Sequence, residues 1–381
     1  MENFDLDITS EILSRVPAES VLQCKLVCKT WRNLLRHIKV GLLFSIGFVE
    51  ACSQIRLNDR KIELYYGEYD EINIDDDQQY SFKSLITRIN HPPLENRFDT
   101  DIIVGSCNGL ACFAIPHWGV EDPVYICNPF TKEYIYLPNS INPQGLIVCG
   151  FGYRFSTDEY KVVRIYYHPD DYEQSVGHVE VYTLGSAIGW RNKGEIPYSI
   201  SVSSSGILAN GALHWLDYKE WKIVAFDLAD EEFRLLPSPP CFRFGNFTTF
   251  YQLQVLGGCL CVVHHERGER LDIWSLKKKK VKEQEKQSWS WSREFSITWK
   301  CLDKDGDYEP FALTKTNEVL LWYNGTILSC YDPKTETLKK LMDDDMGIKY
   351  FKAIPHMNTS VSLKALGERS RCLAEEDNQI S

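Results

Sequence analysis

The feature that most restricts the fold is a unit of about fifty residues that recurs along most of this 381-residue chain. Each copy contains a short segment rich in β-branched and aromatic residues, followed by a polar turn. When five such segments are aligned, their anchor positions fall at residues 127, 182, 226, 274 and 331, with spacings of 55, 44, 48 and 57 residues. A period of this length is typical of kelch-like propeller blades, in which each unit is a small antiparallel sheet.

Each unit also has an internal order. A glycine-marked strand, such as Gly109–Phe113 or Gly211–Trp215, precedes the anchor segment, and a further strand ending in Leu-Pro follows it. In three units the turn between them opens with Asn-Pro, Asp-Pro or an acidic equivalent, whose Asx side chain can bond to the backbone ahead. Residues 41–355 are thus predicted to form an all-β domain of about six blades, the first built around Phe48 to Tyr66. Because the spacing is irregular, a β-sandwich with long loops stays open as an alternative.

The first forty residues follow a different pattern, with apolar residues at helical spacing. Ile8, Ile12 and Leu13 predict a first helix that Pro17 ends, and two further short helices follow, the last carrying Trp31. Three short helices are too few to bury this much apolar surface without a partner. Residues 356–381, at the other end, are expected to be a flexible tail.

The N-terminal segment resembles an F-box of the plant type. The similarity is carried by Asp7-Ile8, Glu11-Ile12-Leu13, Arg15-Val16-Pro17, Ser20-Val21 and Val27-Cys28-Lys29-x-Trp31, with Phe4-Asp5 where F-boxes usually have Leu-Pro. The resemblance implies that residues 1–40 dock on a Skp-type adaptor. The implied contact residues are Phe4, Leu6, Ile8, Ile12, Leu13, Pro17, Val21, Val27, Cys28, Trp31 and Leu34.

The rest of the chain resembles the F-box-associated domain. The matching stretches are Gly105–Leu110, Cys127–Lys132, Gly150–Tyr153, Asp158–Val163, Gly206–Leu216 and Ile223–Leu228. The two resemblances together imply a substrate-recruiting subunit of a ubiquitin ligase that reaches a cullin and a RING subunit through the adaptor. A propeller that binds protein or glycan outside a ligase, or a propeller enzyme with a helical cap, is the alternative.

Composition narrows the range of partners. The net charge of −11 argues against nucleic-acid binding, which depends on basic surface. The lysine run Lys277–Lys280 is the local exception and is expected to be a solvated loop. The longest apolar run, Val40–Val49, is too short to span a membrane, and no signal peptide is visible at the N-terminus. The thirteen cysteines include no Cys-x-x-Cys pair, so reduced thiols and a cytoplasmic or nuclear location are expected.

Three patterns in the sequence resemble catalytic or metal-binding motifs but depart from them. Gly105–Gly109 has the form of a nucleophile elbow, but the following residues continue as strand where the elbow requires a helix. The acidic residues near Gly306 do not keep the spacing of a calcium loop. The pair His264-His265 has no carboxylate or cysteine at metal spacing and is expected at a strand end. No catalytic residue, metal or cofactor is therefore predicted.

Overall fold

The computed structural model of the chain describes residues 8–9, 12–13, 24, 27–34, 40–48, 61–68, 86–89, 103–114, 124–138, 146–168, 171, 175–201, 204–242, 249–266, 269–280, 287–298, 308–314, 316–324, 327–341 and 348–372. Helix α3 (Lys29–Leu34) is followed by strands β1 to β25. In this part of the chain no helix interrupts the strands, so the large domain is all-β, as predicted.

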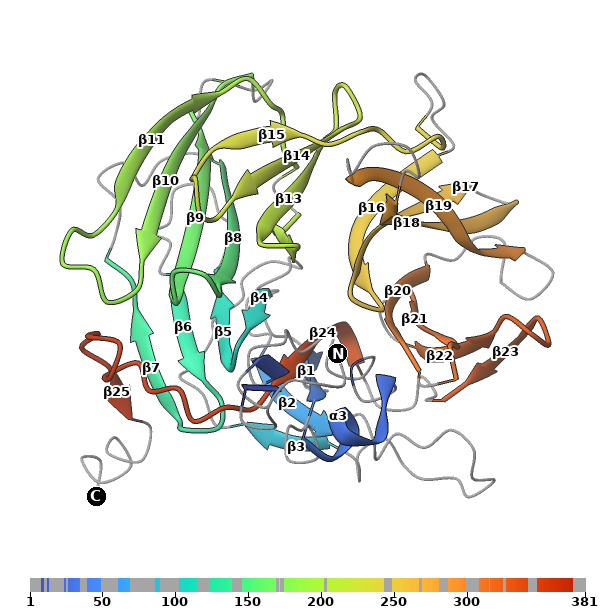
Figure 1. The fold of residues 1–381 in the computed structure, drawn as a ribbon, viewed down its shortest axis with the longest axis horizontal. Coiled ribbons are helices and arrows are strands. Elements are labelled where there is room, and N and C mark those ends of the chain that lie inside the picture. Colours follow the sequence, from blue (N-terminus) through green and yellow to red (C-terminus); the bar gives the residue numbers. More distant parts are fainter. Residues whose placement is uncertain are drawn as a thin grey trace, which may run out of the picture.

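The sheets stand around a central axis as the six blades of a propeller (Figure 1). From the axis outward, the first blade is β24 (Ile348–Met357), β1 (Val40–Phe48), β2 (Lys61–Glu68) and β3 (Ile86–Ile89). The second is β4 (Ile103–Cys107), β5 (Leu110–Phe113), β6 (Tyr125–Asn128), β7 (Glu133–Tyr136) and β25 (Arg371–Cys372). The third is β8 (Leu146–Arg154), β9 (Glu159–Tyr167), β10 (Gly177–Thr183) and β11 (Arg191–Ile196).

The remaining three blades keep the same antiparallel order. The fourth is β12 (Ile207–Ala209), β13 (Ala212–Asp217), β14 (Lys222–Asp227) and β15 (Phe233–Leu235). The fifth is β16 (Thr249–Leu256), β17 (Cys259–Glu266), β18 (Arg270–Lys280) and β19 (Gln287–Thr298). The sixth is β20 (Tyr308–Leu313), β21 (Val319–Tyr323), β22 (Ile327–Asp332) and β23 (Thr337–Lys340). The prediction of six blades is confirmed, and the sandwich alternative is wrong.

The two ends of the domain meet in the first blade. Strand β24, from the end of the domain, pairs antiparallel with β1, from its beginning, with Val40 opposite Met357 and Phe44 opposite Ala353. The inner strands β24, β4, β8, β12, β16 and β20 contact one another in this order, and β20 contacts β24 again. The ring is therefore closed by backbone hydrogen bonds between segments about 300 residues apart.

The repeat read from the sequence corresponds to one position in the blade. The five anchor segments lie on β6, β10, β14, β18 and β22, each the third strand from the axis. The Asx turns after them are also present in three blades. In these turns the side-chain oxygen accepts a backbone N–H two residues ahead: Asn128 from Phe130 at 2.9 Å, Asp227 from Ala229 at 2.8 Å, and Asp332 from Lys334 at 2.8 Å.

The hydrophobic core is divided into six clusters, one at each contact between neighbouring blades. Between the third and fourth blades, Trp215 is fully buried and packs where the backbones of Gly150 and Gly206 bridge. A Cβ atom would lie 2.5 Å from the Trp215 ring at Gly206 and 2.7 Å from it at Gly150. Glycine at both positions therefore makes room for the indole, which supplies much of the apolar burial at this contact.

A charged cluster adds a second link between these two blades. The Glu231 carboxylate, in the turn before β15, accepts two hydrogen bonds from the Arg191 guanidinium at 2.5 and 2.7 Å. Lys161 and Lys193 approach the same carboxylate at 2.9 and 3.1 Å. These bonds, with Arg191 contributing most, lower the pKa of Glu231 to about 2. Three cations of the third blade thus meet one carboxylate of the fourth.

The C-terminal segment, residues 358–372, runs along the outside of the second and third blades. The buried Asn128 amide donates to the carbonyl oxygens of Thr359 and Val361 at 3.1 and 2.6 Å, and Leu363 is fully buried. The Glu368 carboxylate accepts from the backbone N–H of Gly185 at 2.8 Å, and β25 pairs with β7. The expectation of a flexible tail from residue 356 is therefore wrong through residue 372, because these contacts hold the segment on the ring.

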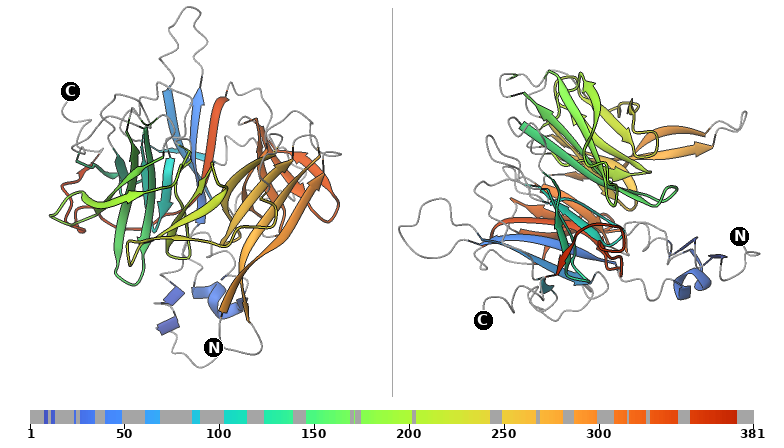
Figure 2. Two further views of the ribbon diagram at one scale, coloured as in Figure 1. Left: turned by 90° about the horizontal axis from the view of Figure 1, so that it is seen from above. Right: turned by 90° about the vertical axis from the view of Figure 1, so that its left-hand side faces the viewer.

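Helix α3 lies outside the ring. Figure 2 shows it on one face of the propeller, the same face from which the end of the β18–β19 pair projects. The lysine run Lys277–Lys280 belongs to this pair and continues β18, so its prediction as a loop is wrong. Lys277 pairs with Glu294 at 2.7 Å, and the Lys278 ammonium lies 5.0 Å from the centre of the Trp289 ring.

Candidate functional site

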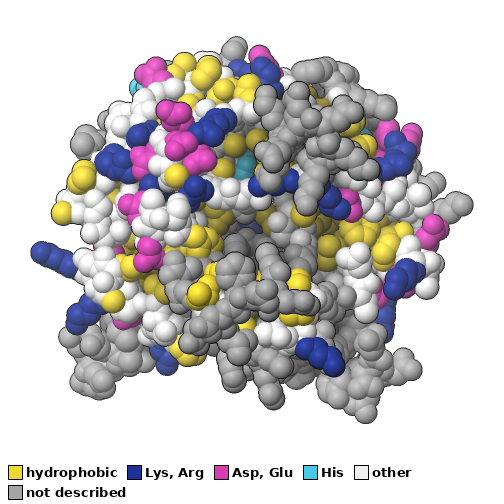
Figure 3. Space-filling model, viewed as in Figure 1, with side chains coloured by type: hydrophobic (Ala, Val, Ile, Leu, Met, Phe, Trp, Pro, Cys, Tyr) yellow, Lys and Arg dark blue, Asp and Glu magenta, His cyan; other side chains and the backbone are white. Residues whose placement is uncertain are grey.

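A cavity of about 740 Å³ lies along the axis of the propeller. Its walls are the inner strands β24, β4, β12, β16 and β20, together with the segment before β12 and neighbouring residues such as Phe151. In the space-filling view the middle of the face is hollowed, and hydrophobic side chains are visible around the hollow (Figure 3). A volume between about 300 and 1,000 Å³ is usual for binding pockets. The cavity is therefore the candidate binding site of the propeller.

The walls of the cavity are mainly apolar and aromatic. Strand β16 lines the cavity along most of its length, and its more exposed residues there, Phe250, Gln252 and Gln254, alternate with the buried Tyr251 and Leu253. This alternation follows from the two-residue period of a strand. Phe250 is 52% exposed, which is unusual for so large an apolar side chain. The inner strand thus presents one aromatic ring and two amides in a row.

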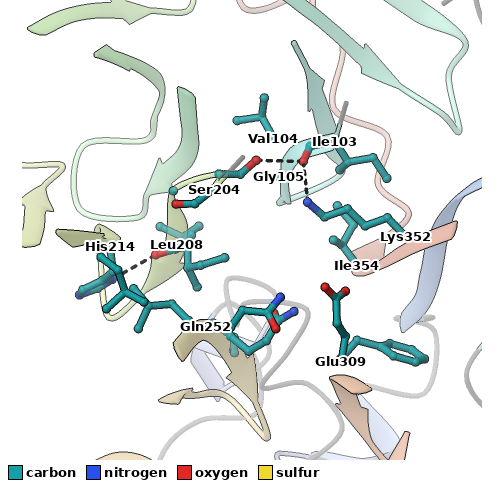
Figure 4. A pocket seen from close by; sticks show the side chains of 18 of the residues that line it. Ile103, Val104, Gly105, Ser204, Leu208, His214, Gln252, Glu309, Lys352 and Ile354 are labelled. Carbon is teal, nitrogen blue, oxygen red and sulfur yellow. Dashed lines mark hydrogen bonds between the residues drawn. The ribbon is translucent and has the colours of Figure 1, made fainter. Parts of the chain in front are cut away.

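A polar cluster lies at one side of the cavity (Figure 4). The carbonyl oxygen of Ile103 on β4 accepts hydrogen bonds from the Ser205 hydroxyl at 3.2 Å and from the Lys352 ammonium at 3.4 Å. Glu309 on β20 and Gln252 on β16 face the same space. Side chains from four blades therefore meet here, although they are far apart in the sequence.

The lining carries almost no net charge. Lys352 and Glu309 are its charged side chains, one of each sign, among the residues that the structure describes there. The histidine of the lining, His214, is buried, and this burial lowers its pKa to about 4, so it is neutral at physiological pH. A ligand with a large net charge would find no matching counter-charge in this cavity.

One acceptor in the cavity wall stands out. The Oε1 atom of Gln252 is buried and has no hydrogen-bond partner within the described part of the chain. A buried amide oxygen without a donor costs about 1–3 kcal/mol. A ligand that donates an N–H or O–H to Gln252 would recover this free energy, so the residue marks a place where a bound molecule would be recognised.

A serine and a histidine also meet at the edge of the cavity. Ser106 on β4 and His356 on β24 share a hydrogen bond of 2.7 Å between Oγ and Nδ1. Burial, only partly opposed by the Asn358 side chain, lowers the pKa of His356 to about 4. An imidazole with so low a pKa is a weak general base, so this pair does not form an activated nucleophile. The turn at Asn108 and Gly109 joins two strands, which agrees with the rejection of a nucleophile elbow.

Part of the predicted adaptor surface lies in the described residues. Ile8, Ile12 and Val27 are 51%, 54% and 63% exposed, a high value for apolar side chains on such a small segment. Leu13, by contrast, is only 1% exposed, so its side chain is buried in the structure. Trp31 and Leu34 are half-buried and Cys28 is exposed. The predicted contacts Phe4, Leu6, Pro17 and Val21 lie outside the described residues.

The third predicted helix is present as α3, and Cys28 caps its start. The backbone N–H of Trp31 donates to the Cys28 sulfur at 3.4 Å, in the place where a serine or aspartate oxygen usually accepts. The helix is six residues long, so it relies on packing by Trp31 and Leu34 for its stability. The first two predicted helices fall mostly outside the described residues, and their number stays a prediction.

None of the ten cysteines whose side chains the structure describes takes part in a disulfide. Burial raises the pKa of Cys127 and of Cys261 to about 12, so these thiols are protonated and unreactive at neutral pH. The histidines His264 and His265 lie near the end of β17 and are buried. Within the resolved strands and turns, no three His, Cys, Asp or Glu side chains are grouped as metal ligands would be. No helix in the same residues is long and apolar enough to cross a membrane.

The structure is thus a six-bladed β-propeller preceded by a helical segment with exposed apolar side chains. The sequence profile of the F-box domain matches residues 1–42, and that of the F-box-associated β-propeller domain matches residues 73–364. The chain therefore belongs to the plant F-box proteins that carry an F-box-associated β-propeller domain.

Curated relatives agree with this family. F-box protein At3g07870 of Arabidopsis thaliana is 30% identical over 94% of this chain and 92% of its own length. F-box/kelch-repeat protein At3g23880 of the same plant is 28% identical over 72% of this chain and 76% of its own. Among solved structures, a chain in a nidogen/laminin complex shares 11% identity with this chain and has a TM-score of 0.44. The match covers 85% of this chain and all of that one. This similarity is too low for a functional comparison.

The sequence did not reveal the cavity residues. Gln252, Glu309 and Lys352 stand in ordinary strand segments, and only the closed ring brings them together. One signal was available, since Gln252 and Gln254 are polar residues at alternate positions in an otherwise apolar and aromatic strand. Polar residues on the axis-facing side of an inner strand are candidates for binding, because the other face is already buried in the blade.

Proposed function

We propose that this chain is the substrate-recognition subunit of a Skp-cullin-F-box ubiquitin ligase. Residues 1–40 would dock on the Skp-type adaptor, and through it on a cullin and a RING subunit, while the propeller holds a target protein. The observation that carries this proposal is the match of an F-box directly before a closed propeller with an axial cavity. The exposed apolar side chains of Ile8, Ile12 and Val27 supply the docking surface.

The chain would act by proximity and not by its own chemistry. Binding a target beside a charged ubiquitin carrier raises the local concentration of target to the millimolar range or so. Ubiquitin transfer would then be performed by the partner proteins. We propose a cytoplasmic or nuclear site of action, where ligase components and reduced thiols occur together, and a kelch-like type of propeller, as expected from the repeat length.

The adaptor interaction can be tested with a matched pair of variants. Ile12→Asp places a charge on an isoleucine that is 54% exposed in the F-box, whereas Ile188→Asp does the same to one that is 73% exposed on the propeller. We expect Ile12→Asp to abolish co-purification with a Skp-type adaptor and Ile188→Asp to retain it. Wild-type binding by Ile12→Asp, with both proteins folded by circular dichroism, would disprove the docking surface.

Ligase activity needs a second measurement. A reconstituted reaction with adaptor, cullin, RING subunit and ubiquitin carrier is expected to modify targets that co-purify with the chain from plant cells. The same reaction with Ile12→Asp is expected to show only background modification. Target modification by this chain alone, with no cullin or adaptor present, would show that the chain is itself an enzyme.

A further inference from the structure

The lining of the axial cavity indicates which kind of target segment it would bind, a point that the proposed function leaves open. Its lining joins apolar and aromatic walls to a few polar groups, and its two charged side chains have opposite signs. We propose that the cavity binds an extended, mainly apolar peptide segment of the target that carries no net charge. This inference rests on the proposed substrate-recognition function and names the class of segment that would be recognised.

The charge of the lining supports an uncharged segment. Lys352 on β24 and Glu309 on β20 stand on neighbouring inner strands, so their charges cancel at short range. A basic or acidic residue deep in the cavity would lose its hydration without gaining a net counter-charge. A segment of apolar and small uncharged residues loses little hydration and can bury its surface against the exposed Phe250 ring.

The polar groups support a peptide rather than a purely apolar ligand. Gln252 has a buried acceptor without a donor, and on another side of the cavity the Lys352 ammonium, a group with three N–H donors, lies at the Ile103 carbonyl. Acceptors and donors on different sides suit the alternating C=O and N–H groups of an extended backbone. Figure 4 shows Gln252 and Lys352 reaching into the space between the blades.

The first experiment selects ligands without assuming a sequence. A phage-displayed library of random peptides, about twelve residues long and so able to enter an axial cavity at ~3.3 Å per residue, is panned on the immobilised full chain. We expect enriched peptides to be rich in apolar residues and to have no net charge. Enrichment of strongly charged peptides, or of none at all, would overturn the proposal.

The second experiment locates the enriched peptide by matched variants. Phe250→Ala and Gln252→Leu change cavity residues, and Phe130→Ala is the control because Phe130 is 61% exposed in the turn between β6 and β7, away from the cavity lining. We expect affinity for a synthetic enriched peptide to fall about tenfold with Phe250→Ala and with Gln252→Leu, and to stay unchanged with Phe130→Ala. Equal affinity for all four proteins would refute the site.

A third measurement asks for a change of selectivity that a structural role would not produce. Lys352→Met leaves the lining with a net negative charge, and Glu309→Gln leaves it with a net positive charge. Panning on Lys352→Met is expected to enrich peptides with one lysine or arginine, and panning on Glu309→Gln to enrich peptides with one aspartate or glutamate. The same neutral peptides from both variants would show that these charges do not set selectivity.

The outcome can be separated from that of the proposed function. Adaptor binding and ubiquitin transfer report on the ligase role and do not involve the peptide library. If the ligase assembles and modifies targets but the library yields charged peptides, this inference fails alone. If neutral peptides bind in the cavity but no adaptor binds, the ligase role fails while the cavity still has its ligand class.

Discussion

Replacing Glu231 with Gln gives a sharp test of how the blades are joined. The carboxylate is 9% exposed and is bound by Arg191, Lys161 and Lys193 of the neighbouring blade. A pKa that falls from its ordinary 4.5 to about 2 in the folded protein corresponds to about 3 kcal/mol of stability at neutral pH. We expect Glu231→Gln to lose about this amount, because the Lys161 ammonium, whose side chain is 5% exposed, loses a carboxylate partner.

The stabilisation by the Glu231 carboxylate should decrease as the pH falls. Because the folded state holds the proton less tightly than the unfolded state, the stabilisation is fully present above pH 4.5 and is lost as the pH falls toward 2. The difference between wild type and Glu231→Gln should therefore shrink from about 3 kcal/mol at pH 7 to about 2 kcal/mol at pH 3.5.

The assay is urea unfolding followed by tryptophan fluorescence at both pH values. Glu232→Gln is the control, since it changes the adjacent exposed carboxylate, and it is expected to move the unfolding midpoint very little. Equal midpoints for wild type and Glu231→Gln at pH 7 would refute the link between the blades. If the difference in unfolding free energy between wild type and Glu231→Gln stays constant from pH 7 to pH 3.5, the stabilisation by Glu231 is not ionic.

Three further predictions address other parts of the molecule. Trp31→Ala is expected to weaken adaptor pull-down, and unchanged pull-down would contradict its role. Because Trp31 is only half-buried, the loss of stability should be smaller than the ~3–5 kcal/mol expected for a fully buried aromatic side chain. Asn128→Ala is expected to cost about 2–4 kcal/mol in chemical unfolding, since it removes two bonds to the C-terminal segment and the turn cap at Phe130; an unchanged midpoint would show these bonds to be unimportant. Removal of residues 1–39 is expected to leave a soluble propeller with one cooperative thermal transition, and aggregation or a broad transition in calorimetry would contradict this.

Much of the fold was visible in the sequence because the blade repeat is local. The anchor on the third strand and the Asx turns at Asn128, Asp227 and Asp332 depend on neighbours within a few residues, so their signals survive in one sequence. The predicted first blade around Phe48 to Tyr66 was located correctly, although its inner strand could not be foreseen. Strand β24 pairs with β1 across the whole domain, and no local pattern announces such a pairing.

The sites were harder to predict for the same reason. The apolar face of the F-box is a local pattern at helical spacing, and Ile8, Ile12 and Val27 are indeed exposed. Spacing alone does not tell which side of a short helix faces inward, and Leu13, which has the same spacing, is 1% exposed. The predicted tail at 356–381 carries no repeat, yet Leu363 and Glu368 within it contact the second and third blades.

Closure of the first blade by β24 has a consequence for how the protein is made. The ribosome releases β1 early, but its partner along one edge is among the last segments to be translated. Until then, β1 presents unpaired N–H and C=O groups next to the apolar side chains of Leu42 and Phe44. A chain that stops before residue 348 would keep this edge open permanently. Nascent and prematurely terminated chains should therefore need chaperones, and only a chain translated through β24 can seal its ring.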